Sequence, residues 1–325
     1  MTTDGALVTG AGGFIGHHLV KALKRRGYWV RGVDIKTPEY EPSTADQFFK
    51  LDLREPGSCV IACDGMHEVY NLAADMGGIG YITANHADIA RNNILINANM
   101  LEAALRAWNV RRFLYSSSAC VYPQYLQDSP DVTPLREDDA YPADPEEGYG
   151  WEKLFTEKLC QYYREDHGLQ TRIVRFHNVY GNCGTFDGGK EKAPAALCRK
   201  IALANPVDEI EVWGDGEQTR SFMHIDDCVE GIYRIAQSGY TGPLNLGTDR
   251  LVTINDLAGI IAKIAGKNIT LRHDLTKPQG VRGRNSDNSL TNRMLGWTPS
   301  IPLEVGLVDT YQWIADQVKA LKTCP

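Results

Sequence analysis

The sequence has no apolar run long enough to cross a bilayer within its 325 residues. Its first residues also lack the charged segment, the long apolar stretch and the small-residue cleavage site that secretion requires. Both absences argue against a membrane-spanning or a secreted protein. We therefore expect a cytoplasmic protein.

Positive charge is scarce as well. The 34 Lys and Arg residues are outnumbered by 41 Asp and Glu residues, which gives a formal net charge of -7. The sequence contains no dense basic run and no basic stripe interleaved with aromatic residues. A nucleic-acid partner is therefore not expected.

The sequence also lacks Cys and His residues at the spacing of a metal site. The eight cysteines include one C-x3-C pair, Cys59 and Cys63, but no second pair of Cys or His residues follows at the spacing of a zinc site. In a reducing compartment these thiols stay free, and most of them suit small positions in a core. We predict no metal site.

A globular composition is present, with 43% hydrophobic and 23% charged residues. A chain of this length usually forms two coupled domains. We expect an NAD-binding domain at 1–175, to which a strand near 240–247 returns, and a mainly sugar-nucleotide-binding domain at 176–325.

The N-terminal region predicts a dinucleotide site. An apolar strand at 6–9 leads into a glycine-rich turn at 10–16, and a helix at 17–26 and a second strand at 27–34 follow. Glycines in such a turn let the backbone approach a pyrophosphate at the helix N-terminus. The residues expected to contact the cofactor there are Gly10, Gly13, Phe14, Ile15 and Gly16.

The acid at the end of the second strand selects the cofactor. Asp34 can accept hydrogen bonds from the adenine ribose hydroxyls and would repel a 2′-phosphate, which favours NAD over NADP. Arg31 and Lys36 lie nearby, and both suit solvated surface charges better than a phosphate contact.

The G-x-x-G-x-x-G spacing resembles that of the extended short-chain dehydrogenase/reductase family. The resemblance implies a Rossmann-type, doubly wound parallel α/β sheet with a smaller C-terminal α/β substrate domain. The glycine-rich stretch 75–80 suits either a substrate loop or a connector. Further cofactor residues implied by this family are Asp52, Leu53, Leu72, Ala73, Ala74, Ser116 and Phe176.

A strand at 111–115 is expected to deliver three serines and the Cys120 thiol into a turn. Ser116 and Ser117 could contact the cofactor or support the turn. Tyr149 and Lys153 are four residues apart and share one face of a helix expected at 149–163. Together with Ser118 they resemble the catalytic group of the short-chain dehydrogenases, in which both Tyr149 and Lys153 would also contact NAD.

The Tyr149 and Lys153 couple suits alcohol oxidation. The Lys153 charge is expected to lower the pKa of Tyr149 from about 10 toward neutrality, so that the phenol can accept an alcohol proton. Hydride then leaves the same carbon for NAD, while Ser118 steadies the developing carbonyl.

Longer motifs narrow the resemblance. G-G-K-E-K-A-P-A-A at 188–196, the stretch 213–222 and R-G-R-N-S-D-N at 282–288, together with 116–120, resemble the GDP-mannose 3,5-epimerase family over nearly the whole chain. The resemblance implies GDP-mannose or a related GDP-hexose as substrate, with Cys120 and Lys192 as opposed acid and base. The substrate-binding residues that it implies are Gly78, Asn178, Glu191, Lys192, Gln218, Arg220, Arg282 and Tyr311.

This family reaction oxidises the hexose at carbon 4, which acidifies the hydrogens on carbons 3 and 5. Cys120 and Lys192 then exchange protons across the ring, and the returned hydride gives GDP-L-galactose, with GDP-L-gulose possible. A nearby positive charge is expected to favour the Cys120 thiolate, and burial near cations is expected to lower the pKa of Lys192.

Other functions stay open. A 4-epimerase would rotate the keto-sugar and need no thiol, whereas a 4,6-dehydratase would need carboxylates near position 120, which Ala119 and Cys120 do not supply. A sugar dehydrogenase would release NADH, and a scaffold or sensor would only bind NAD. The helices expected at 92–108 and 149–163 could pack within one chain or, as the resemblance implies, join a homodimer.

Overall fold

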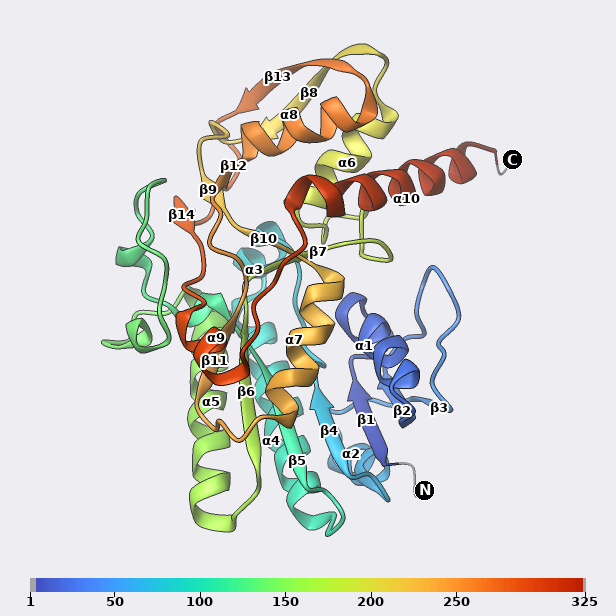
Figure 1. Ribbon diagram of the computed structural model, residues 1–325, viewed down its shortest axis with the longest axis vertical. Coiled ribbons are helices and arrows are strands. Elements are labelled where there is room, and N and C mark those ends of the chain that lie inside the picture. Colours follow the sequence, from blue (N-terminus) through green and yellow to red (C-terminus); the bar gives the residue numbers. More distant parts are fainter. Residues whose placement is uncertain (1–3, 324–325) are drawn as a thin grey trace.

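The computed structural model describes residues 4–323 and has a seven-stranded parallel sheet at its centre (Figure 1). The strand order β11-β6-β5-β4-β1-β2-β3 confirms the expected doubly wound α/β fold. The strands are β1 Gly5–Thr9, β2 Trp29–Asp34, β3 Gln47–Lys50, β4 Glu68–Asn71, β5 Arg112–Ser118, β6 Thr171–Phe176 and β11 Pro243–Leu246.

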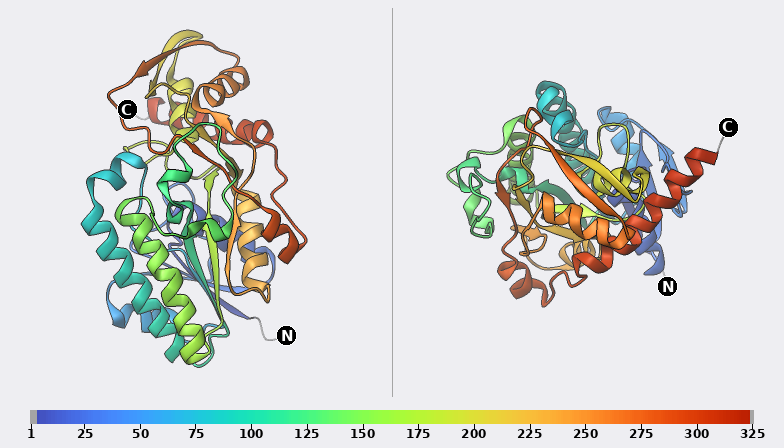
Figure 2. Two further views of the ribbon diagram at one scale, coloured as in Figure 1. Left: turned by 90° about the vertical axis from the view of Figure 1, so that its left-hand side faces the viewer. Right: turned by 90° about the horizontal axis from the view of Figure 1, so that it is seen from above.

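Helices cover both faces of this sheet (Figure 2). α1 Phe14–Arg25 and α7 Ile225–Gln237 pack on one face, and α2 Pro56–Cys63, α4 His86–Arg106 and α5 Glu147–His167 pack on the other. Successive side chains of a strand point to opposite faces, so Ala6 and Val8 join the α1 and α7 side while Leu7 joins the other. Burial on both faces explains why β1 is apolar throughout.

A smaller layer lies beyond the carboxyl ends of the strands, at the top of Figure 1. It contains α6 Ala193–Leu203, α8 Ile254–Ala265, α10 Leu303–Thr323, β8 Val207–Trp213 and β13 Asn268–Asp274. These helices share an apolar cluster that includes Leu197, Ile201, Leu257, Ile261 and Leu307. Within residues 4–323, no helix is both long and apolar enough to cross a membrane.

The remaining strands and helices are short. The strands are β7 Asn178–Tyr180, β9 Thr219–Arg220, β10 Phe222–His224, β12 Val252–Thr253 and β14 Gly283–Arg284, and the helical pieces are α3 Ile79–Ala84, α9 Ser289–Leu295, η1 Ala119–Val121, η2 Gln124–Leu126 and η3 Glu137–Ala140. Among these, β7 pairs in parallel with β10. A three-residue strand whose partner lies far along the chain has no local pattern.

The strand that delivers the serines is longer than predicted. β5 continues through Ser118 because Ser116, Ser117 and Ser118 pair with residues 174–176 of β6. The serines therefore lie in the sheet, and Cys120 lies in the 3-10 turn that follows. Their alternating side chains point to different faces, which separates their roles.

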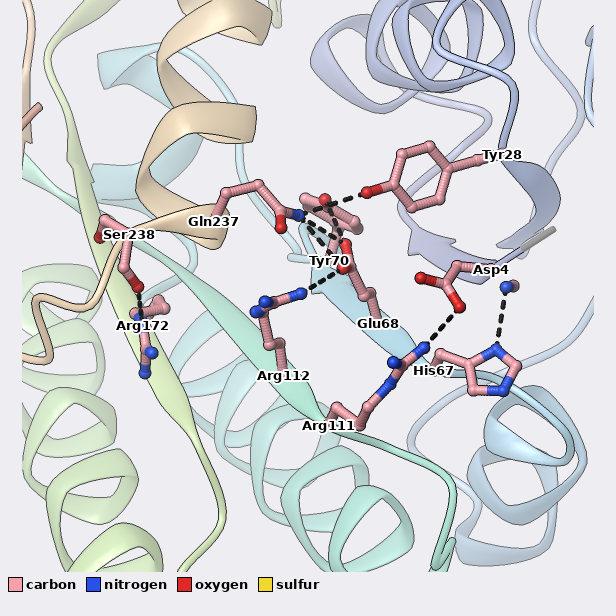
Figure 3. A network of polar contacts seen from close by, with 11 residues as sticks. Asp4, Tyr28, His67, Glu68, Tyr70, Arg111, Arg112, Arg172, Gln237 and Ser238 are labelled. Atoms are coloured by element: carbon pink, nitrogen blue, oxygen red, sulfur yellow. Dashed lines mark hydrogen bonds and ion pairs between the residues drawn. The ribbon is translucent and has the colours of Figure 1, made fainter. Parts of the chain in front are cut away.

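Glu68 joins three elements at the opposite, amino edge of the sheet (Figure 3). Its buried carboxylate accepts hydrogen bonds from the Tyr70 hydroxyl at 2.9 Å and from Gln237 Nε2 at 2.9 Å. It also pairs with Arg112 Nη1 at 2.7 Å. These contacts connect β4, β5 and the end of α7.

We expect Glu68→Ala to lower the free energy of unfolding by about 2–4 kcal/mol, because it leaves a buried hydroxyl and a guanidinium without their acceptor. Urea denaturation measures this loss. Arg106→Ala removes the exposed pair with Glu102 and should cost less than about 1 kcal/mol. A loss of the same small size for Glu68→Ala would contradict its role.

Candidate active site

The site lies where the strand order changes direction, at the carboxyl ends of β1 and β4. Thr9 Oγ1 donates to Asn71 Oδ1 at 2.9 Å and accepts the N–H groups of Leu72 at 3.0 Å and Ala73 at 3.1 Å. A Cβ on Gly10 would lie 3.0 Å from the Ala73 nitrogen. The segment 72–74 is therefore held against the glycine turn.

The glycine turn is shaped for close approach. The Gly12 N–H donates to Asp34 Oδ2 at 2.9 Å, and a Cβ on Gly12 would lie 2.2 Å from the Lys36 carbonyl oxygen. Gly13 caps α1 without a side-chain hydrogen bond, which leaves the first N–H groups of the helix for an anion. This cradle fits the pyrophosphate and adenine ribose of NAD.

Gly12→Ala is expected to weaken NAD binding at least about tenfold, because the added methyl forces the turn away from Lys36 and breaks the Asp34 contact. Calorimetric titration with NAD measures the change. Gly57→Ala is the matched control, since its Cβ in α2 meets nothing within 4 Å. Unchanged affinity in Gly12→Ala would contradict the cradle.

The other residues predicted to contact NAD differ in their burial and in their hydrogen-bond partners. Asp52 pairs with Arg54 at 2.6 Å, and the Leu53 side chain lies in the core, so only its main chain is left for a ligand. Ser116 Oγ donates to the Asn71 carbonyl oxygen at 2.9 Å. Ser117 donates to Glu157, which pairs with the buried Arg175. Ala74, Phe14, Ile15 and Phe176 are partly buried.

The predicted oxidation group comes together at the end of β5. Tyr149 is 5% exposed, and Ser118 lies within hydrogen-bonding reach of its hydroxyl. Lys153 Nζ is 5.5 Å from the Tyr149 ring centroid and donates to the Ser116 carbonyl oxygen at 3.0 Å. The Lys153 ammonium also lies 3.7 Å from Glu152.

The predicted direction of the Tyr149 pKa was wrong for the protein by itself. Burial raises this pKa well above its ordinary value, and the nearby Cys120 and Glu152 raise it further. Ser118 opposes the shift through its hydrogen bond. Loss of hydration by the phenolate is the largest effect, and the Lys153 charge is shared with Ser116 and Glu152.

Cys120 lies near a carboxylate, Glu146, and a guanidinium, Arg284, that were not among the predicted site residues. Arg284 Nη1 is 3.6 Å from Cys120 Sγ, and Arg284 Nη2 is 2.7 Å from Glu146 Oε2. Burial, followed by Glu146, raises the pKa of Cys120 although Arg284 acts in the other direction. The expected thiolate was therefore wrong.

The two missed residues differ in how they could have been found. Arg284 belongs to the same R-G-R-N motif as Arg282, so the motif contained a signal for it. Glu146 sits in an acidic loop that offered no pattern. Its position also corrects the argument that no carboxylate accompanies Cys120.

Lys192 stands directly before α6 and keeps an exposed side chain. Cys120 favours the charged form of Lys192, so the two predicted proton-transfer groups lie near enough for their charges to interact. Loss of hydration within the surrounding protein lowers the pKa of Lys192, and Arg284 adds to this. The direction of this shift is the predicted one, but the predicted burial of Lys192 is wrong, since the residue is exposed.

Arginines gather beside this pair on β9 and β14. Burial, followed by Arg284, lowers the pKa of Arg220 to about 10. Arg282 Nη1 pairs with Asp215 at 3.0 Å. Among the described residues, Gln218 Oε1 and Ser221 Oγ are buried without hydrogen-bond partners. The arginines and the Ser221 hydroxyl can donate to a diphosphate, whereas Gln218 Oε1 can only accept a hydrogen bond, as from a hydroxyl group.

The remaining predicted substrate residues come from four regions. A Cβ on Gly78 would lie 3.0 Å from the Glu191 carbonyl oxygen, so these two residues are neighbours. Asn178 Nδ2 donates to the Ser221 carbonyl oxygen at 3.0 Å. Tyr311 packs against the apolar cluster of α6, α8 and α10. A sugar nucleotide role for these residues is a proposal.

Comparison with known proteins agrees with this geometry. The model of the NAD dependent epimerase/dehydratase family matches residues 6–247. The chain belongs to that family. Its cofactor is accordingly NAD, for which the cradle between Gly12 and Asp34 is shaped.

Two similar proteins carry one name. The chain is 48% identical over 318 residues to GDP-mannose 3,5-epimerase 1 of Oryza sativa subsp. japonica. The aligned region covers 97% of this chain and 83% of that protein. It is 47% identical over 317 residues to GDP-mannose 3,5-epimerase of Arabidopsis thaliana, with the same coverage. Among solved structures, UDP-glucose 4-epimerase of Thermotoga maritima with UDP-glucose has a TM-score of 0.87 and 25% identity, covering 97% of this chain and 99% of its own.

Proposed function

We propose that this member of the family inverts carbons 3 and 5 of GDP-mannose through a transient 4-keto sugar. The observation that carries the proposal is that Cys120, which directly follows β5, interacts electrostatically with both Lys192 and Tyr149. Oxidation alone needs Tyr149, whereas inversion needs a second pair of proton-transfer groups. The names of the two plant relatives support the same substrate.

Each group has one task in this mechanism. Tyr149 accepts the proton of the carbon 4 hydroxyl, and Ser118 donates a hydrogen bond to the developing carbonyl oxygen. NAD, when bound, supplies the reversible removal of hydride from carbon 4. The ketone acidifies the neighbouring carbons, where Lys192 and Cys120 move protons on opposite faces of the ring.

The arginines hold the rest of the substrate. Arg220 and Arg282 bind the diphosphate oxygens, and the buried Gln218 Oε1 accepts a hydrogen bond from a hydroxyl group of the substrate. Asn178, Gly78, Glu191 and Tyr311 line the path of the sugar nucleotide. The product is GDP-L-galactose, with GDP-L-gulose formed when only carbon 5 inverts.

Incubation with GDP-mannose in deuterated water tests the proposal. Proton spectra should show deuterium at carbons 3 and 5, with no net release of NADH. Accumulation of free NADH would identify a sugar dehydrogenase, and loss of water from the sugar would identify a dehydratase. NAD binding without deuterium uptake would leave a scaffold or sensor.

The proposal includes a homodimer. α4 and α5 pack together within the chain (Figure 2), yet α5 leaves Trp151, Phe155 and Tyr162 about half exposed. This apolar stripe suits the same stripe of a second copy. Light scattering should give a dimer that Phe155→Glu dissociates and that Val207→Glu, an exposed apolar position on β8, leaves intact.

The proposal also places the protein in the cytoplasm, because Cys120 needs a reducing compartment to act as a thiol. A small sugar nucleotide and NAD are its partners there, and neither a membrane nor a nucleic acid is part of the reaction. Detection of the protein in a fractionated cell extract checks this location.

A further inference from the structure

We propose that Glu41, which joins α1 to the loop after β7, is a positioning residue that keeps NADH bound while the 4-keto sugar exists. The inference rests on the proposed function, because the ketone is reduced again only if the hydride carrier stays in its site. It adds to that function the control of cofactor exit.

Three donors from two segments meet at one carboxylate oxygen. Glu41 Oε1 lies 2.9 Å from His17 Nε2 and 2.6 Å from Lys21 Nζ, both on α1. It also accepts the Cys183 thiol, from the loop after β7, at 3.3 Å. Hydrogen bonds from Lys21 and then from His17 lower the pKa of Glu41 to about 2, so the carboxylate is charged and can only accept. We call these four residues the Glu41 cluster.

The loop that carries Glu41 runs from β2 to β3 and rises beside α1 toward α10 (Figure 1). The Tyr40 ring lies 5.7 Å from the Phe186 ring and 4.9 Å from the Trp313 ring of α10, measured between centroids. The Phe186 and Trp313 rings are themselves 5.6 Å apart. The adjacent residues Tyr40 and Glu41 therefore attach this loop to the C-terminal layer by aromatic packing and to α1 by charge.

The attached loop forms one wall of the cavity beside the glycine turn. Gly12 and Gly13 of the turn line this cavity, and so do Glu41, Cys183 and Thr185 of the two loops. Because the turn is the cradle for the pyrophosphate, a bound dinucleotide has these loops on its other side. The loops must separate before the cofactor leaves past them, and the Glu41 cluster opposes that separation.

The backbone around Cys183 directs its thiol. Cys183 has a φ of +57°, a left-handed conformation that residues other than glycine rarely adopt. Burial lowers the pKa of His18 to about 4, so its ring is neutral and Nε2 donates to the Asn182 carbonyl oxygen at 3.0 Å. A Cβ on Gly181 would lie 2.4 Å from Ile225 Cγ2, so this end of the loop is closely packed. The thiol is therefore held near Glu41 by contacts that do not involve the carboxylate.

The rate at which NADH leaves the protein tests the inference without substrate, when its fluorescence is followed after mixing with excess NAD. Glu41→Ala should raise this rate about tenfold and Lys21→Met about threefold, because the loops then separate more often. Lys24→Met is the matched control and should leave the rate unchanged. Lys24 lies three residues further along α1 and forms an ion pair of the same 2.6 Å length with Asp46, outside the residues that line the cavity. An unchanged rate in Glu41→Ala would overturn the inference.

The association rate separates control of the exit from simple stabilisation of bound NADH. Loops that must separate for the cofactor to leave must also separate for it to enter, so Glu41→Ala should raise the association rate too. Faster dissociation with unchanged association would contradict this role. Cys183→Ser should keep the wild-type rates, because its hydroxyl still donates to Glu41, whereas Cys183→Ala should speed dissociation.

Incubation with GDP-mannose gives a readout during the reaction. The Glu41→Ala protein should release NADH into an ultrafiltrate that stays free of it with the wild type, and retention of all NADH by this variant would count against the inference. Wild-type protein without deuterium uptake would refute the proposed function, whereas the dissociation rates measured without substrate would still decide the role of Glu41.

Discussion

Lys192→Ala is expected to reduce deuterium uptake at carbons 3 and 5 of GDP-mannose by about 100-fold to 10,000-fold, the contribution of a general acid or base. Cys120→Ala should have an effect of the same size, because inversion needs both faces of the ring. Proton spectroscopy in deuterated water measures the loss. NAD affinity should stay unchanged, since neither side chain belongs to the glycine turn.

The pH dependence follows from the direction of the Lys192 shift. Lys192 must be unprotonated in the direction of the reaction in which it removes a proton, so the rate in that direction should rise with pH as Lys192 loses its proton. Because the pKa of Lys192 is lowered from its ordinary value of 10.5, this rise should lie below that pH. Lys190→Ala, which removes the neighbouring lysine above the Tyr81 ring, is the matched control. Undiminished exchange in Lys192→Ala would refute its role in proton transfer.

Tyr149→Phe is expected to lower turnover by a similar 100-fold to 10,000-fold, but at an earlier step. Without the hydroxyl the carbon 4 proton has no acceptor, so no ketone forms and no deuterium enters. The near-ultraviolet absorbance of reduced nicotinamide separates the steps after rapid mixing with GDP-mannose. It should still appear in Lys192→Ala and should be absent in Tyr149→Phe.

Tyr163→Phe provides the control on the same helix. Its hydroxyl contacts Glu102 on α4, away from Cys120, and its loss should not change the rate. Since burial raises the pKa of Tyr149, deprotonation of this residue should require the positive charge of bound oxidised NAD. Full activity in Tyr149→Phe would contradict its role as the proton acceptor.

The parallel sheet was predictable because local signals agree. The apolar run of β1, the glycine turn and the acid at the end of β2 each mark one step of a repeated strand and helix unit. β7 escaped prediction because its three residues acquire their extended form from β10. The end of β5 was placed too early because serines favour turns, whereas here the pairing with β6 keeps them extended.

The proximity of Tyr149 and Lys153 could be predicted because it depends only on their spacing along one helix. Tyr149 and Lys153 lie four residues apart and both reach the end of β5. Charge states were harder to predict, because the loss of hydration depends on every layer that covers a group. Glu146 shows the same limit, since its contact with Cys120 exists only after α5 packs against the turn beyond β5.

The sequence by itself determined the α/β fold, the NAD site and the identity of the groups that can move protons, because these depend on residue type and short-range spacing. Only the tertiary structure decided the direction in which the pKa values of Tyr149, Cys120 and Lys192 shift and the partnership of Glu146 with Arg284. The reason is physical: side-chain chemistry is local, whereas hydration and electric field are set by atoms brought together from distant parts of the chain.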